Sequence, residues 1–161
     1  MEIYLLRHGI AENGRPGHPD SERALTPEGR DKLRRVLKRA RAAGMEPDAI
    51  LSSPYVRAVE TAAIAAEVLG YAGKVERTRT LTPDASPHDA WAEIRTRPGY
   101  GAILLSGHEP FMSSMAAFLL ASPALQVDVK KAGLVRIDCE HAGPQPHGVL
   151  KWMITPGIVG E

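Results

Sequence analysis

Residues 102–110 read AILLSGHEP and carry the clearest signal for a core strand in the chain. The four consecutive apolar residues at 102–105 suit a strand that is covered on both faces. The glycine and proline that follow break the strand, and a helix through Phe118 and Leu119 is expected next. A buried strand that leads directly into a helix is the repeating unit of an α/β protein.

The rest of the chain repeats this pattern. Further strands are expected at residues 2–6, 49–51 and 75–80, where short apolar or β-forming runs occur. Helices are expected to begin where a hydroxyl residue that can cap a helix precedes a proline, at Thr26-Pro27, Ser53-Pro54 and Ser86-Pro87. Gly44 and Gly70 are expected to end the first two of these helices.

The C-terminal part of the chain has a different pattern. Residues 134–139 and 149–154 alternate in strand fashion around a connection rich in glycine and proline, which predicts a β-hairpin. Together the elements predict an α/β fold, a three-layer α/β/α sandwich with a mostly parallel sheet and an antiparallel C-terminal edge. Because the chain has 161 residues and no linker-like tract, a single domain over residues 1–161 is expected.

Composition restricts the class of protein. Lys and Arg number 20 and Asp and Glu number 19, so the formal net charge is +1 and no global field exists to hold nucleic acid or an anionic membrane. The single cysteine, Cys139, excludes an intrachain disulfide and fits a reducing compartment. The N-terminus lacks signal-peptide features, and no apolar stretch approaches the roughly 18 residues that span a bilayer. The sequence therefore predicts a cytoplasmic protein with no membrane segment and no nucleic-acid partner.

Basic side chains follow three of the expected strands, at the points where ligands bind in open α/β sheets. Arg7 and His8 follow the first strand; Arg57 lies one turn into the helix after the second, and His108 follows the strand at 102–105. Two arginines and two histidines at one rim suit a phosphoryl group, because guanidinium groups bind its oxygens in a bidentate way. No cluster of carboxylates with Mg²⁺ spacing is evident, so we expect no metal and no cofactor.

His8 is the candidate nucleophile, because a neutral imidazole nitrogen can attack phosphorus and divide one displacement into two easier steps. The carbonyl of Gly9 could hold the other ring nitrogen in its N–H form. His108 would then be a second donor to the phosphoryl oxygens. Taken alone, Arg57 would more often be a solvated helix residue or an ion-pair partner of Glu60.

Four short motifs occur in order at the junctions between expected strands and helices. They are RHG at 7–9, LTPEG at 25–29, SSP at 52–54 followed by Arg57, and GHEP at 107–110. This series resembles the histidine phosphatase, or phosphoglycerate-mutase-like, superfamily, and the compact chain is most similar to its short phosphohistidine phosphatases of the SixA type. The resemblance implies a phosphoglycerate-mutase-like fold and a metal-independent phosphatase. It also implies that Arg7, His8, Arg57 and His108 bind phosphate and act in catalysis, with a phospho-His8 intermediate.

One segment departs from the family pattern and bears on the substrate. Many mutases and acid phosphatases of the superfamily carry a proton-donating glutamate at about the position of Pro83. An alkoxide leaving group needs a strong acid, whereas the imidazole of phosphohistidine leaves with much less help. The expected substrate is therefore a phosphohistidine protein, and Asp84 and Glu12 are the candidate proton donors if esters are cleaved instead. The alternatives are a general small-molecule phosphomonoesterase of the same superfamily and a non-catalytic module that binds a phosphorylated ligand.

The expected first helix is strongly basic away from its apolar stripe. Its basic residues are Arg30, Lys32, Arg34, Arg35, Lys38, Arg39 and Arg41. The plainer interpretation is a solvated face. The alternative is a surface that docks an acidic protein partner.

Overall fold

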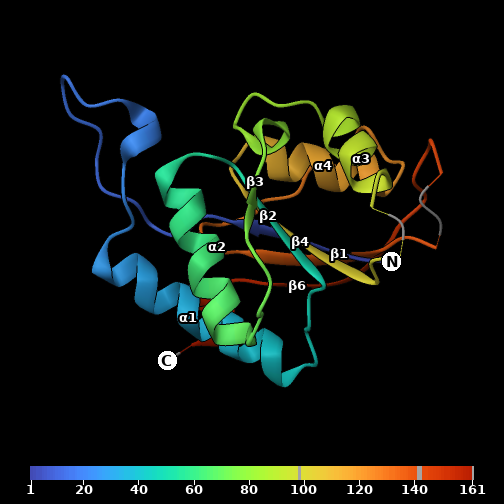
Figure 1. Cartoon of the computed structure of the whole chain (residues 1–161), viewed down its shortest axis with the longest axis horizontal. Helices are drawn as coiled ribbons and strands as arrows, with labels where there is room; N and C mark the ends of the chain where they lie inside the picture. Colours follow the sequence, from blue (N-terminus) through green and yellow to red (C-terminus); the bar gives the residue numbers. More distant parts are fainter. Residues whose placement is uncertain (98, 141–142, 161) are drawn as a thin grey trace.

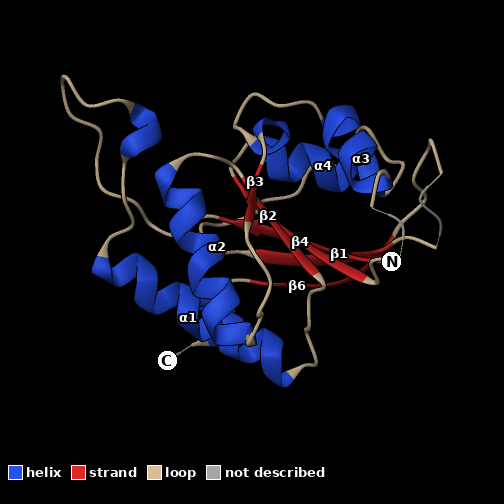
Figure 2. Cartoon of the chain, viewed as in Figure 1, coloured by secondary structure: helices blue, strands red, loops and turns tan. Residues whose placement is uncertain are grey.

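The computed structural model describes residues 1–97, 99–140 and 143–160, which form one mixed sheet between two layers of helices (Figure 1; Figure 2). The strands lie in the order β3-β2-β4-β1-β5-β6. They are β1 (Glu2–Arg7), β2 (Ala49–Ser52), β3 (Glu76–Arg77), β4 (Ala102–Gly107), β5 (Leu134–Asp138) and β6 (Val149–Ile154). The first four pair in parallel, whereas β5 is antiparallel to both β1 and β6. The predicted mostly parallel sheet with an antiparallel C-terminal edge is confirmed.

The helices cover both faces of this sheet. They are α1 (Pro27–Ala42), α2 (Val56–Leu69), α3 (Pro87–Arg95), α4 (Phe111–Leu119) and α5 (Pro156–Val159), with the 3₁₀ helices η1 (Asp20–Glu22) and η2 (Arg79–Leu81). α1 and α2 pack on one face, and α3 and α4 on the other (Figure 1), which confirms the three-layer sandwich. Over the described ranges, the helices are too short or too polar to cross a membrane.

Strand β1 illustrates how the sequence divides the core between the two faces. Ile3 and Leu5 pack with α3 and α4, while Tyr4 and Leu6 pack with α1 and α2. Successive side chains of a strand point to opposite faces, so a strand with helices on both sides needs apolar residues at every position. The uninterrupted apolar runs of β1 and β4 follow from this arrangement.

The predicted ends of α1 and α2 agree with the structure at three points. Thr26 caps α1, its Oγ1 accepting a hydrogen bond of 2.9 Å from the backbone N–H of Gly29, and Pro27 is the first helical residue. Gly44 follows the last turn of α1 with a φ of 90°. Gly70 ends α2 with a φ of 69°, a conformation that glycine adopts without steric cost.

Two predicted boundaries are wrong. α2 begins at Val56 and not at Pro54, because Ser53 Oγ accepts a hydrogen bond from the backbone N–H of Tyr55 and holds a turn before the helix. The strand expected at 75–80 is limited to β3, because Thr78 caps η2 instead of continuing the strand. Ser53 and Thr78 both lie just after the carboxyl end of a parallel strand, β2 and β3 respectively.

The loop after β1 packs directly on the first turn of α1. A Cβ atom on Gly29 would lie 2.2 Å from the carbonyl oxygen of Ile10 and 2.9 Å from its nitrogen. A Cβ atom on Gly9 would lie 3.1 Å from the carbonyl oxygen of Gly29. Glycine permits this approach of two backbones, which holds the loop that follows His8 against α1.

Replacing Gly29 with alanine is expected to lower the free energy of unfolding by about 1–3 kcal/mol, since the added methyl group must displace backbone atoms. Chemical denaturation of the purified protein measures this change. Gly14→Ala is the matched control, because a Cβ atom there would meet nothing closer than 4.0 Å. An unchanged denaturation midpoint for Gly29→Ala would contradict the close packing.

Candidate active site

The parallel pairing of β1 with β4 brings the two predicted site histidines together. Arg7 is the register partner of Gly107, and the residues that follow them are His8 and His108. The backbone N–H of His8 donates to the carbonyl of Gly107 at 2.9 Å. The two imidazole rings lie with their centroids 5.2 Å apart. Arg57, in the first turn of α2, completes the predicted group, because its Nε lies 3.3 Å from His8 Nε2.

The ring of His8 is held in one orientation by both of its nitrogen atoms. Nδ1 lies 2.7 Å from the carbonyl oxygen of Gly9, so Nδ1 carries the proton and donates it to this bond. Nε2 then presents its lone pair on the side of Arg57, whose Nε–H donates to it. The side chain is buried, and burial is the main cause that lowers the pKa of His8 to about 4; the bond to Gly9 opposes this shift and Arg57 adds to it. His8 is therefore neutral near pH 7 and has the form that a nucleophile requires.

His108 is buried more deeply, with 1% of the residue exposed. Its Nε2 lies 2.8 Å from Ser53 Oγ, and the ring of Tyr55 meets it edge-on at a centroid distance of 4.9 Å. Burial, followed by the nearby His8 and Arg57, lowers the pKa of His108 to about 3. The serine expected only to cap a helix thus helps to orient a site histidine, a role that no local sequence pattern signals.

Arg57 is bound on its outer side by Asp20, a residue that the sequence analysis did not single out. Nη1 of Arg57 donates to the backbone carbonyl of Asp20 at 2.8 Å, and Nη2 donates to the carboxylate at 3.0 Å. The carboxylate of Asp20 also accepts from Arg23. Burial of Asp20 acts to raise its pKa, but the bonds from Arg23 and Arg57 outweigh burial and lower it. Asp20 is therefore a charged partner near neutral pH, and not an acid that carries a proton.

The suggested ion pair between Arg57 and Glu60 is wrong. Glu60 instead accepts hydrogen bonds from the backbone N–H of Leu25 and from Arg30. The side chain of Asp20 lies 37 residues away from Arg57 in the chain, in a loop with no periodic pattern. Nothing in the spacing of residues could have identified this contact.

Arg7 lies at the other side of the histidines. Its Nη1 donates to the carbonyl oxygen of Val129 at 2.9 Å. The Nε atom of Arg7 and the Nδ1 atom of His108 are both buried, and both lack a hydrogen-bond partner among the described residues. Unpartnered buried polar atoms on two residues of the basic cluster are what a site that receives a polar ligand would show.

The candidate proton donors Asp84 and Glu12 are both exposed. The carboxylate of Asp84 accepts a hydrogen bond from Thr82, and Glu12 makes its described hydrogen bonds through the backbone. In the contacts that the structure describes, neither carboxylate touches the two histidines or Arg57. A role for them as acids stays a prediction.

Three further histidines that the structure describes lie at the surface. His18, His88 and His147 are exposed, and His88 packs on the ring of Phe118 at a centroid distance of 4.6 Å. His141 lies outside the described residues. Within the described ranges, no group of three or more His, Cys, Asp and Glu side chains is arranged to hold a metal ion.

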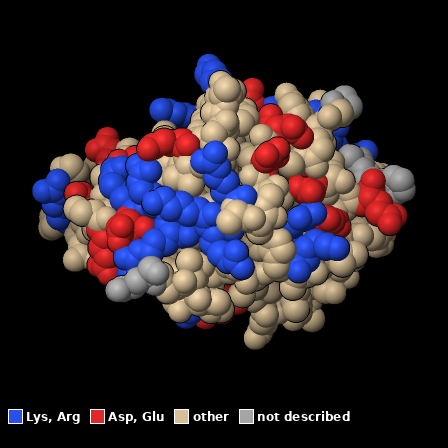
Figure 3. Space-filling model, turned by 90° about the horizontal axis from the view of Figure 1, so that it is seen from below, with Lys and Arg blue, Asp and Glu red and all other residues tan. Residues whose placement is uncertain are grey.

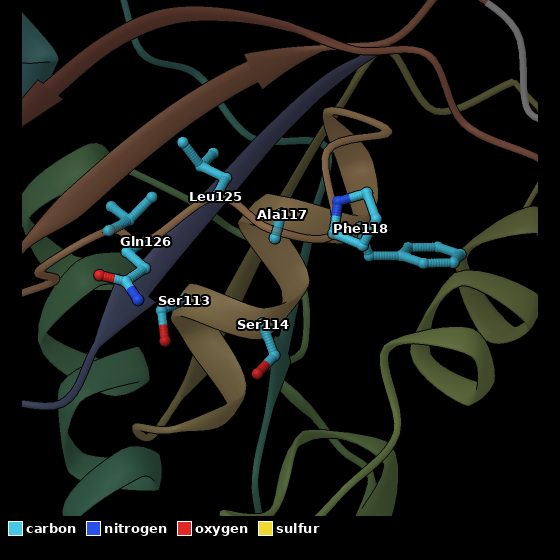
Figure 4. A pocket seen from close by; sticks show the side chains of 8 residues that line it. Ser113, Ser114, Ala117, Phe118, Leu125 and Gln126 are labelled. Atoms are coloured by element: carbon cyan, nitrogen blue, oxygen red, sulfur yellow. The ribbon is translucent and has the colours of Figure 1, made fainter.

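A separate hollow lies against α4 and is lined by none of these basic residues (Figure 4). Its volume is about 380 Å³, and Ser113, Phe118 and Gln126 are among its lining residues. None of its lining residues is charged or a histidine, so it lacks the charged groups that bind a phosphoryl oxygen most strongly.

Comparisons with known proteins identify the family and the fold of the chain. Residues 3–82 match a family model for the histidine phosphatase superfamily (branch 1). The chain is 31% identical over 149 residues to an uncharacterized protein of Picosynechococcus sp. (strain ATCC 27264 / PCC 7002 / PR-6), covering 91% of this chain and 90% of that protein. It is 25% identical over 158 residues to the phosphohistidine phosphatase SixA of Escherichia coli (strain K12), covering 97% and 94%. The solved structure of the protein histidine phosphatase SixA complexed with tungstate matches with a TM-score of 0.85 and 22% identity, over 99% of this chain and 100% of that one.

The protonation of the two buried histidines can be followed by NMR of protein labelled with ¹⁵N at histidine. We expect the rings of His8 and His108 to stay neutral as the pH falls through 6.5 and to take up protons near pH 4 and pH 3. The physical reason is burial, which disfavours the charged ring. The variants His8→Asn and His108→Asn assign the two sets of signals, and a charged His8 ring at pH 6 would contradict the expectation.

The lowered pKa values of His8 and His108 also determine whether stability rises or falls with pH. The pKa values of both histidines in the folded protein lie below the ordinary value of 6.5. At pH values between each lowered pKa and 6.5, the unfolded chain therefore binds more protons than the folded protein. The contribution of these two groups to the free energy of unfolding is complete above about pH 6.5 and falls as the pH drops toward 4.

Proposed function

The chain belongs to the histidine phosphatase superfamily, in its SixA-like branch, and on this premise we propose that it hydrolyses phosphohistidine in proteins through a phospho-His8 intermediate. Membership makes the chain a phosphatase; the substrate and the roles of the residues are the proposal. The phosphohistidine phosphatase SixA, which is similar over nearly the whole chain, supports the choice of substrate.

Substrate binding uses the positive groups around His8 Nε2. Arg57 Nε already faces that nitrogen, so a phosphoryl group that approaches it meets a guanidinium donor. Arg7, with its unpartnered Nε, and His108 bind the remaining oxygens from the other side. A loose phosphoryl transition state carries its charge on these oxygens, so donors at fixed positions stabilise it.

The first chemical step is an in-line attack by the lone pair of His8 Nε2 on phosphorus. The P–Nε2 bond forms as the bond between phosphorus and the substrate imidazole breaks, and that imidazole leaves with the electron pair. A proton on the other nitrogen of the substrate ring lets it leave as a neutral imidazole. In the second step water attacks phosphorus, and the P–Nε2 bond breaks with its electron pair returning to Nε2. Phosphate is released as H₂PO₄⁻, which carries both protons of the water.

One observation carries the choice of phosphohistidine over ordinary esters. The carboxylate that touches the site, Asp20, accepts hydrogen bonds from Arg57 and Arg23 and has a lowered pKa, which makes it a poor proton donor. An alkoxide leaves slowly without a proton donor, whereas the imidazole of phosphohistidine does not depend on one. The site therefore suits a P–N bond better than a P–O bond.

Replacing His8 with alanine is expected to abolish turnover, because the proposed first step needs the lone pair of His8 Nε2 to attack phosphorus. His147→Ala, at an exposed position in the connection between β5 and β6, is the matched control and should keep the activity of the unchanged protein. Brief reaction with labelled substrate should also leave an acid-labile phosphoryl group on His8. Turnover by His8→Ala, or a label on a different residue, would overturn the assignment of the nucleophile.

The substrate class is tested by comparing kcat/KM for a phosphohistidine peptide, a phosphoserine peptide and a small phosphate ester. The phosphohistidine peptide is expected to react faster by about 100-fold or more, the usual contribution of a general acid that the site lacks. Asp84→Asn should leave the phosphohistidine rate unchanged. Equal or faster cleavage of esters, with a loss in Asp84→Asn, would instead support the small-molecule phosphomonoesterase.

A further inference from the structure

A cavity of about 570 Å³ lies directly beside Arg7, on the side of α1 and α5. Its lining includes four basic side chains, Arg7, Lys32, Lys130 and Lys131, and the apolar residues Ile10 and Pro156. Among the residues that the structure describes, no Asp or Glu side chain lines it. We call it the lysine cavity, and its positive charge marks it as a place for anionic groups.

The lysines of this cavity are available to a ligand. Lys32 pairs with Glu28 and Lys130 pairs with Asp128, and in each pair the acidic side chain is well exposed. Exposed pairs of this kind contribute little free energy, so an incoming carboxylate can replace them. Lys131 is exposed and has no ion-pair partner among the residues that the structure describes.

The backbone fixes these lysines next to the nucleophile. The carbonyl of Val129 accepts the hydrogen bond from Arg7, and the N–H of Ala132 donates to the carbonyl of His8 at 3.0 Å. Lys130 and Lys131 occupy the two positions between these anchors. A chain bound at the active site would therefore pass the lysine cavity within a few residues of its phosphorylated group.

The surface charge around the cavity argues for a protein ligand. Figure 3 shows a band of Lys and Arg on the face that α1 covers, with Asp and Glu at its edges and within it. Several basic residues of α1 are paired there, such as Arg30 with Glu60 and Arg34 with Glu67. With a net charge of only +1, the chain has no long-range field for nucleic acid. The positive charge at the cavity is local, and its opposing carboxylates are exposed and replaceable, which suits a short acidic segment.

We propose that the lysine cavity binds acidic side chains that lie close to the phosphorylated histidine of the substrate protein. This inference rests on the proposed function and adds to it a rule of specificity. The ammonium groups bind the carboxylates, while Ile10 and Pro156 contact the methylene groups of glutamate side chains. The positive cavity thereby selects phosphohistidines in acidic surroundings over those in neutral or basic ones.

The test measures binding and not turnover, so that it does not depend on catalysis. Two fluorescent peptides carry the same non-hydrolysable phosphohistidine analogue, one flanked by Asp and Glu and the other by Asn and Gln. Fluorescence anisotropy gives the Kd of each for the unchanged protein, for Lys130→Ala/Lys131→Ala, and for the control Lys38→Ala/Arg39→Ala. The control residues are exposed basic residues of α1 that do not line the cavity.

For the unchanged protein, the acidic peptide should bind about tenfold or more tightly than the amide peptide, because several weak charged contacts act together. Lys130→Ala/Lys131→Ala should remove most of this preference, and the control should keep it. Equal binding of the two peptides by the unchanged protein overturns the inference, whether or not the variant folds. A single-stranded oligonucleotide that competes as well as the acidic peptide also overturns it. A different result would contradict the proposed function: the protein would fail to hydrolyse phosphohistidine substrates and would still bind the acidic peptide more tightly.

Discussion

The parallel pairing of β1 with β4 is the interaction on which the site depends. Register alone places Arg7 beside Gly107, so the residues that leave the two strands emerge at the same edge of the sheet. The bond from the N–H of His8 to Gly107 extends the pairing by one residue, into the site itself. The close contact of Gly29 with Ile10 then holds the departing loop against α1. His8 is thus positioned mainly by backbone geometry.

Burial determines which side chains of the basic cluster are charged. Two histidines and two arginines within one cluster would repel one another if all were charged. Burial keeps the rings of His8 and His108 neutral, and Asp20 balances the charge of the buried Arg57. A buried guanidinium without such a partner would be costly. The loop that contains Asp20 therefore belongs to the site, although it has little regular structure.

Much of the architecture could be read from local patterns. Apolar runs in β1 and β4 predict strands with helices on both faces, and Thr26 with Pro27 predicts the start of α1. Such patterns succeed because each depends on residues close in the chain. They fail at Ser53, where the residues before α2 form a turn and the serine binds a histidine 55 residues away. A propensity for capping says nothing about a partner brought in by the sheet.

The sequence by itself determined the kind of fold, the residues of the basic cluster and the family. Its alternating strands and helices place Arg7, His8, Arg57 and His108 at strand ends, and those ends meet in any sheet of this type. The tertiary structure alone decided which nitrogen of His8 is free, that Asp20 binds Arg57, and that Lys130 and Lys131 line a cavity beside Arg7. These features depend on distances between segments that are remote in the chain. Such distances are set by packing and long-range backbone hydrogen bonds, which leave no periodic trace in the sequence.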